Sequence, residues 1–138
     1  MLIQKVDKYY DKELYDLNCA ETMVYAANEE YNMNLSTDTL KSVAAFGGGM
    51  AVEDTCGALT GSLVVISILF TKERAHESDF IKKLTTEFIE KFKAKIKTIN
   101  CKELKILYRT DELRCTVMVE AAAEVLDELV LREKVQAI

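Results

Sequence analysis

The sequence predicts an all-α, single-domain helical bundle of about five to seven helices, with no sheet. The chain of 138 residues contains no proline, which would break helices, and all five glycines lie within residues 47–61. Apolar residues recur at steps of three or four along most of the chain, which is the period of a helix. The length suffices for one domain with a hydrophobic core, and the sequence shows no linker or internal repeat. We therefore expect one domain spanning residues 1–138.

Apolar stripes predict three helices in the first third of the chain. The first stripe consists of Leu2, Val6, Tyr10, Leu14 and Leu17. The second consists of Cys19, Met23, Ala26, Ala27 and Tyr31. Asparagines at positions 32 and 34 mark a turn, after which Ser36 is expected to cap a third helix that runs to about residue 46.

The second half of the chain predicts a buried central helix and further amphipathic helices. Residues 59–70 are apolar nearly all round, as in a helix surrounded by others. Ser78 is expected to open the clearest amphipathic helix, whose apolar face holds Ile81, Leu84, Phe88, Phe92, Ile96 and Ile99. A short segment covers residues 102–108. Asp111 is then expected to open the last helix, with Cys115, Val119, Ala122, Leu126 and Leu129 in register.

Charge and hydropathy exclude several classes of function. The net charge of −5 argues against a general nucleic-acid binder, which needs surplus lysine and arginine. The longest apolar run, residues 63–70, is too short to span a membrane. The first 16 residues carry scattered charges and no apolar core, so they do not resemble a secretory signal. We therefore expect a cytoplasmic protein.

The four cysteines are the candidate functional residues, because cytoplasmic cysteines are usually reduced, metal-bound or catalytic. Cys19 and Cys101 each follow an asparagine and precede a glutamate in the pattern N-C-x-E, a variant of the capping box. Cys56 follows two good N-cap residues, so we expect it in a first turn. Cys115 lies four residues after the predicted start of the last helix. All four cysteines are thus predicted to lie at helix N-termini.

Helix N-termini carry partial positive charge, which favours thiolate over thiol and can lower a cysteine pKa. The thiolate is both the nucleophile and the metal ligand. Four converging thiolates would therefore hold a metal or an iron–sulfur cluster, or cycle between dithiol and disulfide. We expect Cys56 to be the central residue and Cys19 the next. Because no C-x-x-C spacing occurs, a shared site would have to be assembled by the fold from distant segments. The alternative is that the cysteines only pack in the core and have no chemical role.

The glycines are candidate supporting residues around Cys56. A run of three can form a helix C-cap followed by a left-handed turn, or let backbone approach a ligand closely. Gly57 and Gly61 are four residues apart and therefore share one face of a helix. We expect another helix that carries a cysteine to approach this face closely. No Gly-Lys-Ser/Thr follows, so a nucleotide loop is excluded. The residues concerned are Gly47, Gly48, Gly49, Gly57 and Gly61.

Other polar candidates are weaker. His76 is the only histidine and is expected to be a solvated surface residue. Arg109 and Arg114 can pair with thiolates or with Asp111 and Glu112, and the sequence leaves both pairings open.

Together these residues resemble the C_GCAxxG_C_C family, small proteins proposed to be redox-active and named for their cysteines. The motif CGAxxG reads CGALTG at residues 56–61, and the FGGGM loop at residues 46–50 precedes it. Cys19 supplies the first cysteine, and Cys101 and Cys115 supply the last two. The resemblance covers about residues 19–126. It implies an all-helical fold, a redox or metal-cluster role, and an oxidoreductase or transporter partner. Some members resemble exported cofactor-carrying proteins, but without a twin-arginine pattern in these residues we expect a cytoplasmic location.

The leading hypothesis is a redox-active protein whose four cysteine thiolates hold a metal or iron–sulfur cluster or form a dithiol/disulfide couple. A second hypothesis is a helical interaction module, such as a homodimer, whose cysteines only pack. A third is a small-molecule carrier that uses the groove beside the glycines.

Overall fold

Helix α4 (Gly57–Phe70) lies at the centre of the fold, where α2, α5 and α7 pack against it. The computed structural model describes residues 1–136, and within them it has seven α-helices, 72% helical content and no strand. The remaining α-helices are α1 (Leu2–Tyr9), α2 (Cys19–Glu30), α3 (Thr37–Lys41), α5 (Phe80–Ile96), α6 (Cys101–Tyr108) and α7 (Thr116–Gln136). Short helical turns cover η1 (Ala44–Phe46), η2 (Gly49–Glu53) and η3 (Ala75–Glu77). The predicted all-α bundle is confirmed.

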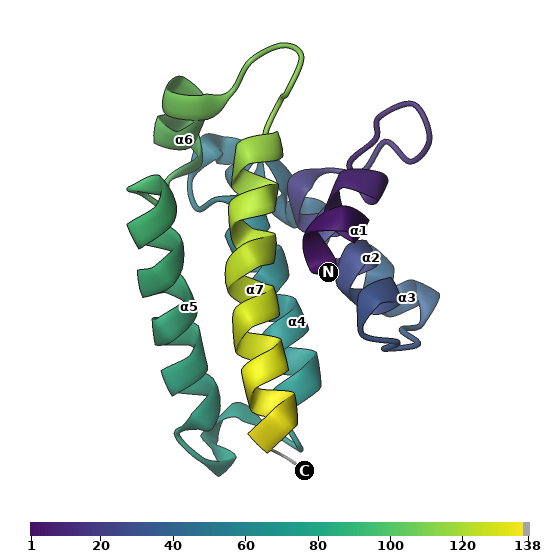
Figure 1. Cartoon of the computed structure of the whole chain (residues 1–138), viewed down its shortest axis with the longest axis vertical. Helices are drawn as coiled ribbons and strands as arrows, with labels where there is room; N and C mark the ends of the chain where they lie inside the picture. Colours follow the sequence, from purple (N-terminus) through teal and green to yellow (C-terminus); the bar gives the residue numbers. More distant parts are fainter. Residues whose placement is uncertain (137–138) are drawn as a thin grey trace.

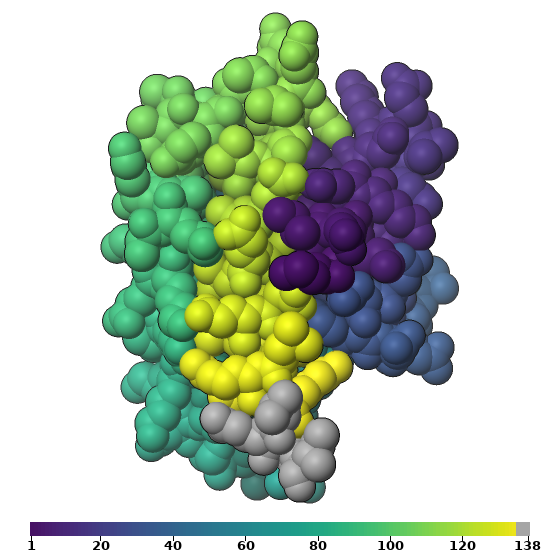
Figure 2. Space-filling model, viewed as in Figure 1, coloured from purple at the N-terminus to yellow at the C-terminus, as the bar shows by residue number. Residues whose placement is uncertain are grey.

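The long helices α4, α5 and α7 run alongside one another, and α1, α2 and α3 lie on one side of them (Figure 1). The beginnings of α4, α6 and α7 lie at the same end of the bundle (Figure 1). The space-filling view shows α7 on the surface between α5 and α1 (Figure 2). No helix of the described residues has the length and apolar character needed to cross a membrane.

Helix α5 packs against the bundle with the central part of the apolar face that its sequence predicts. The helix begins at Phe80 rather than at Ser78 and ends at Ile96, so Ile99 lies beyond it. Leu84, Phe88, Phe92 and Ile96 are buried, and the rings of Phe88 and Phe92 stack with centroids 6.0 Å apart. Ion pairs then join α5 to α7 at the surface, with Lys91, Lys95 and Glu87 of α5 bonding to glutamates or an arginine of α7 at 2.7–2.9 Å. Such exposed pairs contribute little to stability, so the apolar face dominates this contact.

The first predicted helix is too long, because α1 ends at Tyr9 and Leu14 is 73% exposed. The carboxylate of Asp11 accepts the backbone N–H groups of Glu13 and Leu14 at 2.9 and 3.1 Å. A local side-chain bond of this kind stabilises a turn in competition with the helix.

Two other predicted boundaries are wrong. The helix capped by Ser36 ends at Lys41, well before residue 46, and only a short helical turn follows. The last helix begins at Thr116 rather than at Asp111, because residues 110–114 form a turn closed by backbone pairing. Arg114 adopts a positive φ of 50° in this turn, a conformation that no helix tolerates.

A buried carboxylate joins three helices. Asp127 of α7 is only 6% exposed and accepts the backbone N–H of Leu2 at 3.3 Å and the hydroxyl of Tyr31 at 2.7 Å. These bonds connect the start of α1 and the end of α2 to α7. Both donors are buried and would remain unpaired without the carboxylate.

We predict that Asp127→Ala lowers the free energy of unfolding by roughly 2–3 kcal/mol, because it leaves two buried donors without an acceptor. Glu128→Ala is the matched control, since the neighbouring carboxylate is 54% exposed and pairs with Lys91 at the surface. It should cost less than about 1 kcal/mol. Urea denaturation measures both values, and equal losses would contradict the proposed role of Asp127.

Candidate functional site: four cysteines at helix N-termini

Two cysteines are the first residues of their helices, as predicted. Cys19 begins α2 and Cys101 begins α6. The side-chain oxygens of the preceding Asn18 and Asn100 accept the N–H of the third helical residue at 2.8 and 3.0 Å. In α2 the glutamate at that position also accepts the Asn18 N–H at 3.0 Å, which completes the capping box.

Cys56 is the N-cap residue of α4 and not part of its first turn, contrary to the prediction. The backbone leading to it is extended, because Thr55 pairs with Asn100 in an isolated antiparallel bridge. The Cys56 N–H donates to the Ile99 carbonyl at 2.8 Å, and the Cys101 N–H donates to a carbonyl two residues before Cys56. This pairing brings the starts of α4 and α6 together.

Cys115 directly precedes α7, and its carbonyl accepts the Val119 N–H at 3.1 Å, as an N-cap residue does. Its own N–H donates to the hydroxyl of Tyr10 at 3.1 Å. Cys115 is half-buried, whereas the other three cysteines are buried. All four cysteines thus lie at helix N-termini, although two lie one residue earlier than the helix itself.

Helix α2 crosses α4 at its two glycines. A Cβ atom on Gly57 would collide with the Cys19 sulfur, and one on Gly61 would lie 2.6 Å from the Ala20 carbonyl oxygen. Both helices can therefore approach closely only because these positions lack side chains. The predicted approach of a cysteine-bearing helix beside Cys56 is confirmed.

The last two residues of the triple glycine begin the predicted left-handed turn, which lies beside Cys101. Gly48 and Gly49 both have φ of 64°, and Met50 and Ala51 continue in the same region at 61° and 65°. A Cβ atom on Gly49 would lie 2.7 Å from the Cβ of Cys101. The turn therefore packs directly on the start of α6.

Burial dominates the electrostatics of these thiols. It raises the pKa of Cys56 from 9.0 to about 12, and negative charge on Cys19 or Cys101 raises that pKa too. The backbone N–H groups of Leu59 and Ala58 lower the Cys56 pKa but do not offset burial. The sequence left the direction of the Cys56 pKa shift open, because Asp54 opposes the effect of the helix N-terminus. In the structure burial decides it, and Cys56 is protonated at neutral pH.

Cys19 lies within electrostatic range of each of the other three thiols. Burial raises its pKa, the Gly48 N–H lowers it, and charge on Cys115 raises it. Burial likewise raises the pKa of Cys101, which Lys105 lowers and charges on Cys19 and Cys115 raise. We call these four thiols the cysteine cluster. Cys19 interacts electrostatically with each of the other three, and the central place of Cys56 stays a prediction.

This cluster does not have the geometry of a metal site. Within residues 1–136, no group of three or more cysteine, histidine or acidic side chains is placed to hold a metal ion. All four cysteines are free thiols. The donor set that the sequence predicts is present, but its arrangement does not fit a metal or a cluster.

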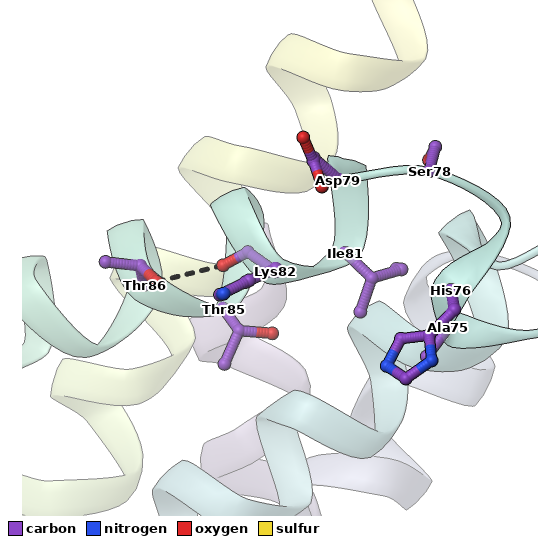
Figure 3. A pocket seen from close by; sticks show the side chains of 8 residues that line it. All are labelled: Ala75, His76, Ser78, Asp79, Ile81, Lys82, Thr85 and Thr86. Atoms are coloured by element: carbon purple, nitrogen blue, oxygen red, sulfur yellow. Dashed lines mark hydrogen bonds between the residues drawn. The ribbon is translucent and has the colours of Figure 1, made fainter.

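His76 is exposed, as expected, and lies outside the cysteine cluster. It lines a hollow of about 570 Å³ beside the start of α5, with Ile81, Lys82 and other residues but no cysteine. Figure 3 shows these side chains and the hydrogen bond from the Thr86 hydroxyl to the Lys82 carbonyl. This hollow is therefore separate from the thiols.

Sequence reasoning missed Tyr10 and left Arg114 undecided. The Arg114 guanidinium lies over the Tyr10 ring, 4.1 Å from its centroid, and donates a hydrogen bond to the Tyr10 carbonyl. In the sequence, Tyr10 is an ordinary member of the first apolar stripe. Nothing in the sequence places it beside Cys115, which lies 105 positions away.

Fold and site together define a small all-α protein with a cluster of four cysteines at helix N-termini. A family model matches residues 17–129 and carries the description "Putative redox-active protein (C_GCAxxG_C_C)". The chain belongs to this C_GCAxxG_C_C family, so the resemblance seen in the sequence is confirmed. Comparison with curated proteins and with solved structures gave no match.

The crossing of α2 and α4 predicts the sign of a stability change. Alanine for glycine inside a helix normally stabilises it by up to about 1 kcal/mol. We expect Gly61→Ala instead to destabilise the protein by about 1–3 kcal/mol, because the new methyl group meets the Ala20 backbone. Ser67→Ala, on the exposed side of α4, is the control and should be near neutral or slightly stabilising. Urea denaturation measures both, and a gain in stability for Gly61→Ala would refute the close contact.

The burial pattern predicts an order of thiol reactivity. At pH 8, iodoacetamide should modify Cys115 first and Cys56 last, with rates that differ at least about tenfold, because only thiolates in contact with solvent react. Peptide mass spectrometry over time measures the four rates. In 6 M guanidinium as the control, roughly equal rates are expected for all four cysteines, since unfolding removes burial. Native rates that are equal for all four would contradict this geometry.

Proposed function

We propose that the protein is a thiol–disulfide redox protein that carries two electrons, with Cys115 as the thiol that meets external disulfides and Cys19 as the thiol that completes the disulfide. The observation that carries this proposal is that four free thiols interact electrostatically, while Cys115 alone among them is not buried. Charge on Cys115 acts on Cys19, so these two thiols are close enough to influence each other.

The chemistry is exchange with a disulfide of a partner, for which an oxidoreductase is the candidate class. The Cys115 thiolate attacks one sulfur of the partner disulfide, which forms a mixed disulfide and releases one partner thiolate. The Cys19 thiolate then attacks the Cys115 sulfur, which forms the Cys19–Cys115 disulfide and releases the second partner thiolate. The two protons lost by Cys19 and Cys115 pass to the released thiolates. Two electrons thus move from the protein to the partner, and the reverse sequence reduces the protein.

Cys101 and Cys56 supply a second, more deeply buried dithiol. Charge on Cys19 acts on both thiols, and the backbone pairing at Thr55 and Asn100 brings their segments together. In this proposal they exchange with the outside through Cys19. Their raised pKa values keep them protonated at neutral pH, which slows direct reaction with an external disulfide.

The proposal is supported by burial as well as by proximity. Cys115 is only partly buried, so it is the cysteine that an external disulfide can reach most readily. The metal and iron–sulfur hypotheses predict at least three thiols placed around a common centre, and the described residues do not offer that arrangement. A dithiol/disulfide couple requires only two thiols that can approach each other.

The test is exchange with oxidised glutathione, followed by mapping of the products by mass spectrometry. We expect a Cys19–Cys115 disulfide in the wild type, and a glutathione adduct on Cys115 that persists in Cys19→Ser. Cys115→Ser should react at least about tenfold more slowly, because the remaining thiols are buried. Cys56→Ser is the matched control, since it removes a cluster thiol that the first steps do not use.

Two results would overturn the proposal. The first is exchange in Cys115→Ser at the wild-type rate, which would place the entry point elsewhere. The second is stoichiometric metal, with a visible absorption band, in protein purified without oxygen. That result would replace the dithiol couple by a metal centre.

A further inference from the structure

Tyr10 approaches the cysteine cluster from outside the segment that defines the family. It is the C-cap residue that follows α1, and it precedes residues 17–129, which the family model matches. Its side chain is nevertheless only 9% exposed. A polar phenol buried beside thiols needs specific partners, because an unpaired buried hydroxyl is costly.

Three contacts hold Tyr10 against the segment that carries Cys115. The phenol oxygen accepts the Cys115 backbone N–H at 3.1 Å. The Arg114 guanidinium lies over the ring, 4.1 Å from its centroid, and also donates to the Tyr10 carbonyl. Ring, hydroxyl and backbone of Tyr10 are therefore all tied to residues 114 and 115, which fixes the position of the phenol oxygen.

The phenol retains a proton to donate. In the hydrogen bonds found among residues 1–136, the Tyr10 hydroxyl accepts one bond and donates none. Burial raises the pKa of Tyr10 to about 12, and negative charge on Cys115 or on Cys19 raises it too, whereas the Cys115 N–H and Arg114 lower it. The hydroxyl thus stays protonated at neutral pH and lies within electrostatic range of both sulfurs used in the proposed exchange.

Several charged side chains surround Tyr10, whereas its own hydroxyl is a neutral hydrogen-bond donor. Tyr10 and Arg114 line a hollow of about 230 Å³ together with the carboxylates of Asp7, Asp11 and Glu112. These three carboxylates and the Arg114 guanidinium are the charged groups that share this hollow with Tyr10, and Cys115 does not line it. A neutral O–H donor stabilises the thiolate without adding a further charge.

We propose that Tyr10 is a positioning residue for thiol exchange: it anchors the backbone of Cys115 and turns its O–H toward the thiolate that forms at Cys115 in the first step. The inference rests on the proposed function for its role in exchange. Tyr10 takes part in no electron transfer and forms no covalent bond. Its proton stays on the phenol oxygen as a hydrogen bond is made to the sulfur.

The test is Tyr10→Phe, which removes the hydroxyl and keeps the ring under Arg114. We expect the pH profile of Cys115 alkylation by iodoacetamide to move upward by about one pH unit, equivalent to about tenfold slower reaction at pH 8. Tyr9→Phe is the matched control, because that hydroxyl donates to Glu29 at 3.0 Å and does not face the thiols. Its profile should equal that of the wild type. A merely structural Tyr10 would change thermal stability in Tyr10→Phe but leave the profile in place, and that result overturns the inference.

A reciprocal measurement follows, because the chain has six tyrosines and no tryptophan. Tyrosinate absorbance at 295 nm then reports tyrosine ionisation alone. If charge on the thiols raises the Tyr10 pKa, oxidation of Cys115 should lower the titration midpoint of one tyrosine, and this change should vanish in Tyr10→Phe. An unchanged midpoint in the wild type overturns the inference.

The two proposals fail in distinguishable ways. If glutathione forms no Cys19–Cys115 disulfide but Tyr10→Phe still shifts the Cys115 profile, the exchange mechanism fails and the contact of Tyr10 with the Cys115 thiolate stands. If the disulfide forms and the profile does not move, the exchange mechanism stands and the role of Tyr10 fails.

Discussion

The close crossing of α2 over α4 is the contact on which the site depends. It is possible because Gly57 and Gly61 present no side chain to α2, so that Cys19 and Ala20 lie directly on the α4 backbone. Any side chain at these positions would push α2 outward and separate Cys19 from Cys56. One backbone-to-backbone contact therefore determines both the packing of the two helices and the spacing of their cysteines.

Two opposing effects act on the thiols, and their magnitudes decide the outcome. A helix N-terminus typically stabilises a nearby negative charge by 0.3–1 kcal/mol, and by up to about 2 kcal/mol in favourable cases. The rise of the Cys56 pKa from 9.0 to about 12 corresponds to roughly 4 kcal/mol against the thiolate. Burial therefore outweighs the field of the helix. A site built in this way keeps its inner thiols protonated and leaves reaction with the outside to the half-buried Cys115.

The turn of residues 48–51 closes the cluster on the side of α6. Four successive left-handed residues are unfavourable for an L-amino-acid chain unless neighbouring contacts hold them. Here Gly49 packs on Cys101, and the ion pair between Glu53 and Lys105 at 3.3 Å joins the end of the turn to α6. The glycines thus allow the segments that carry cysteines to pack closely, and this role does not require a bound ligand.

The sequence by itself determined the helical class, the buried faces of α4 and α5, and the placement of Cys19 and Cys101 as the first residues of their helices. These features follow from local rules: proline is absent, apolar residues repeat with the helical period, and asparagine caps Cys19 and Cys101. Tertiary structure alone decided that the first helix ends at Tyr9, that Cys19 lies against Gly57 of α4, and that Tyr10 reaches Cys115. It also decided the thiol pKa values, because desolvation depends on neighbours that are distant in the chain. A local pattern specifies where a helix begins, but only packing specifies what surrounds its first residue.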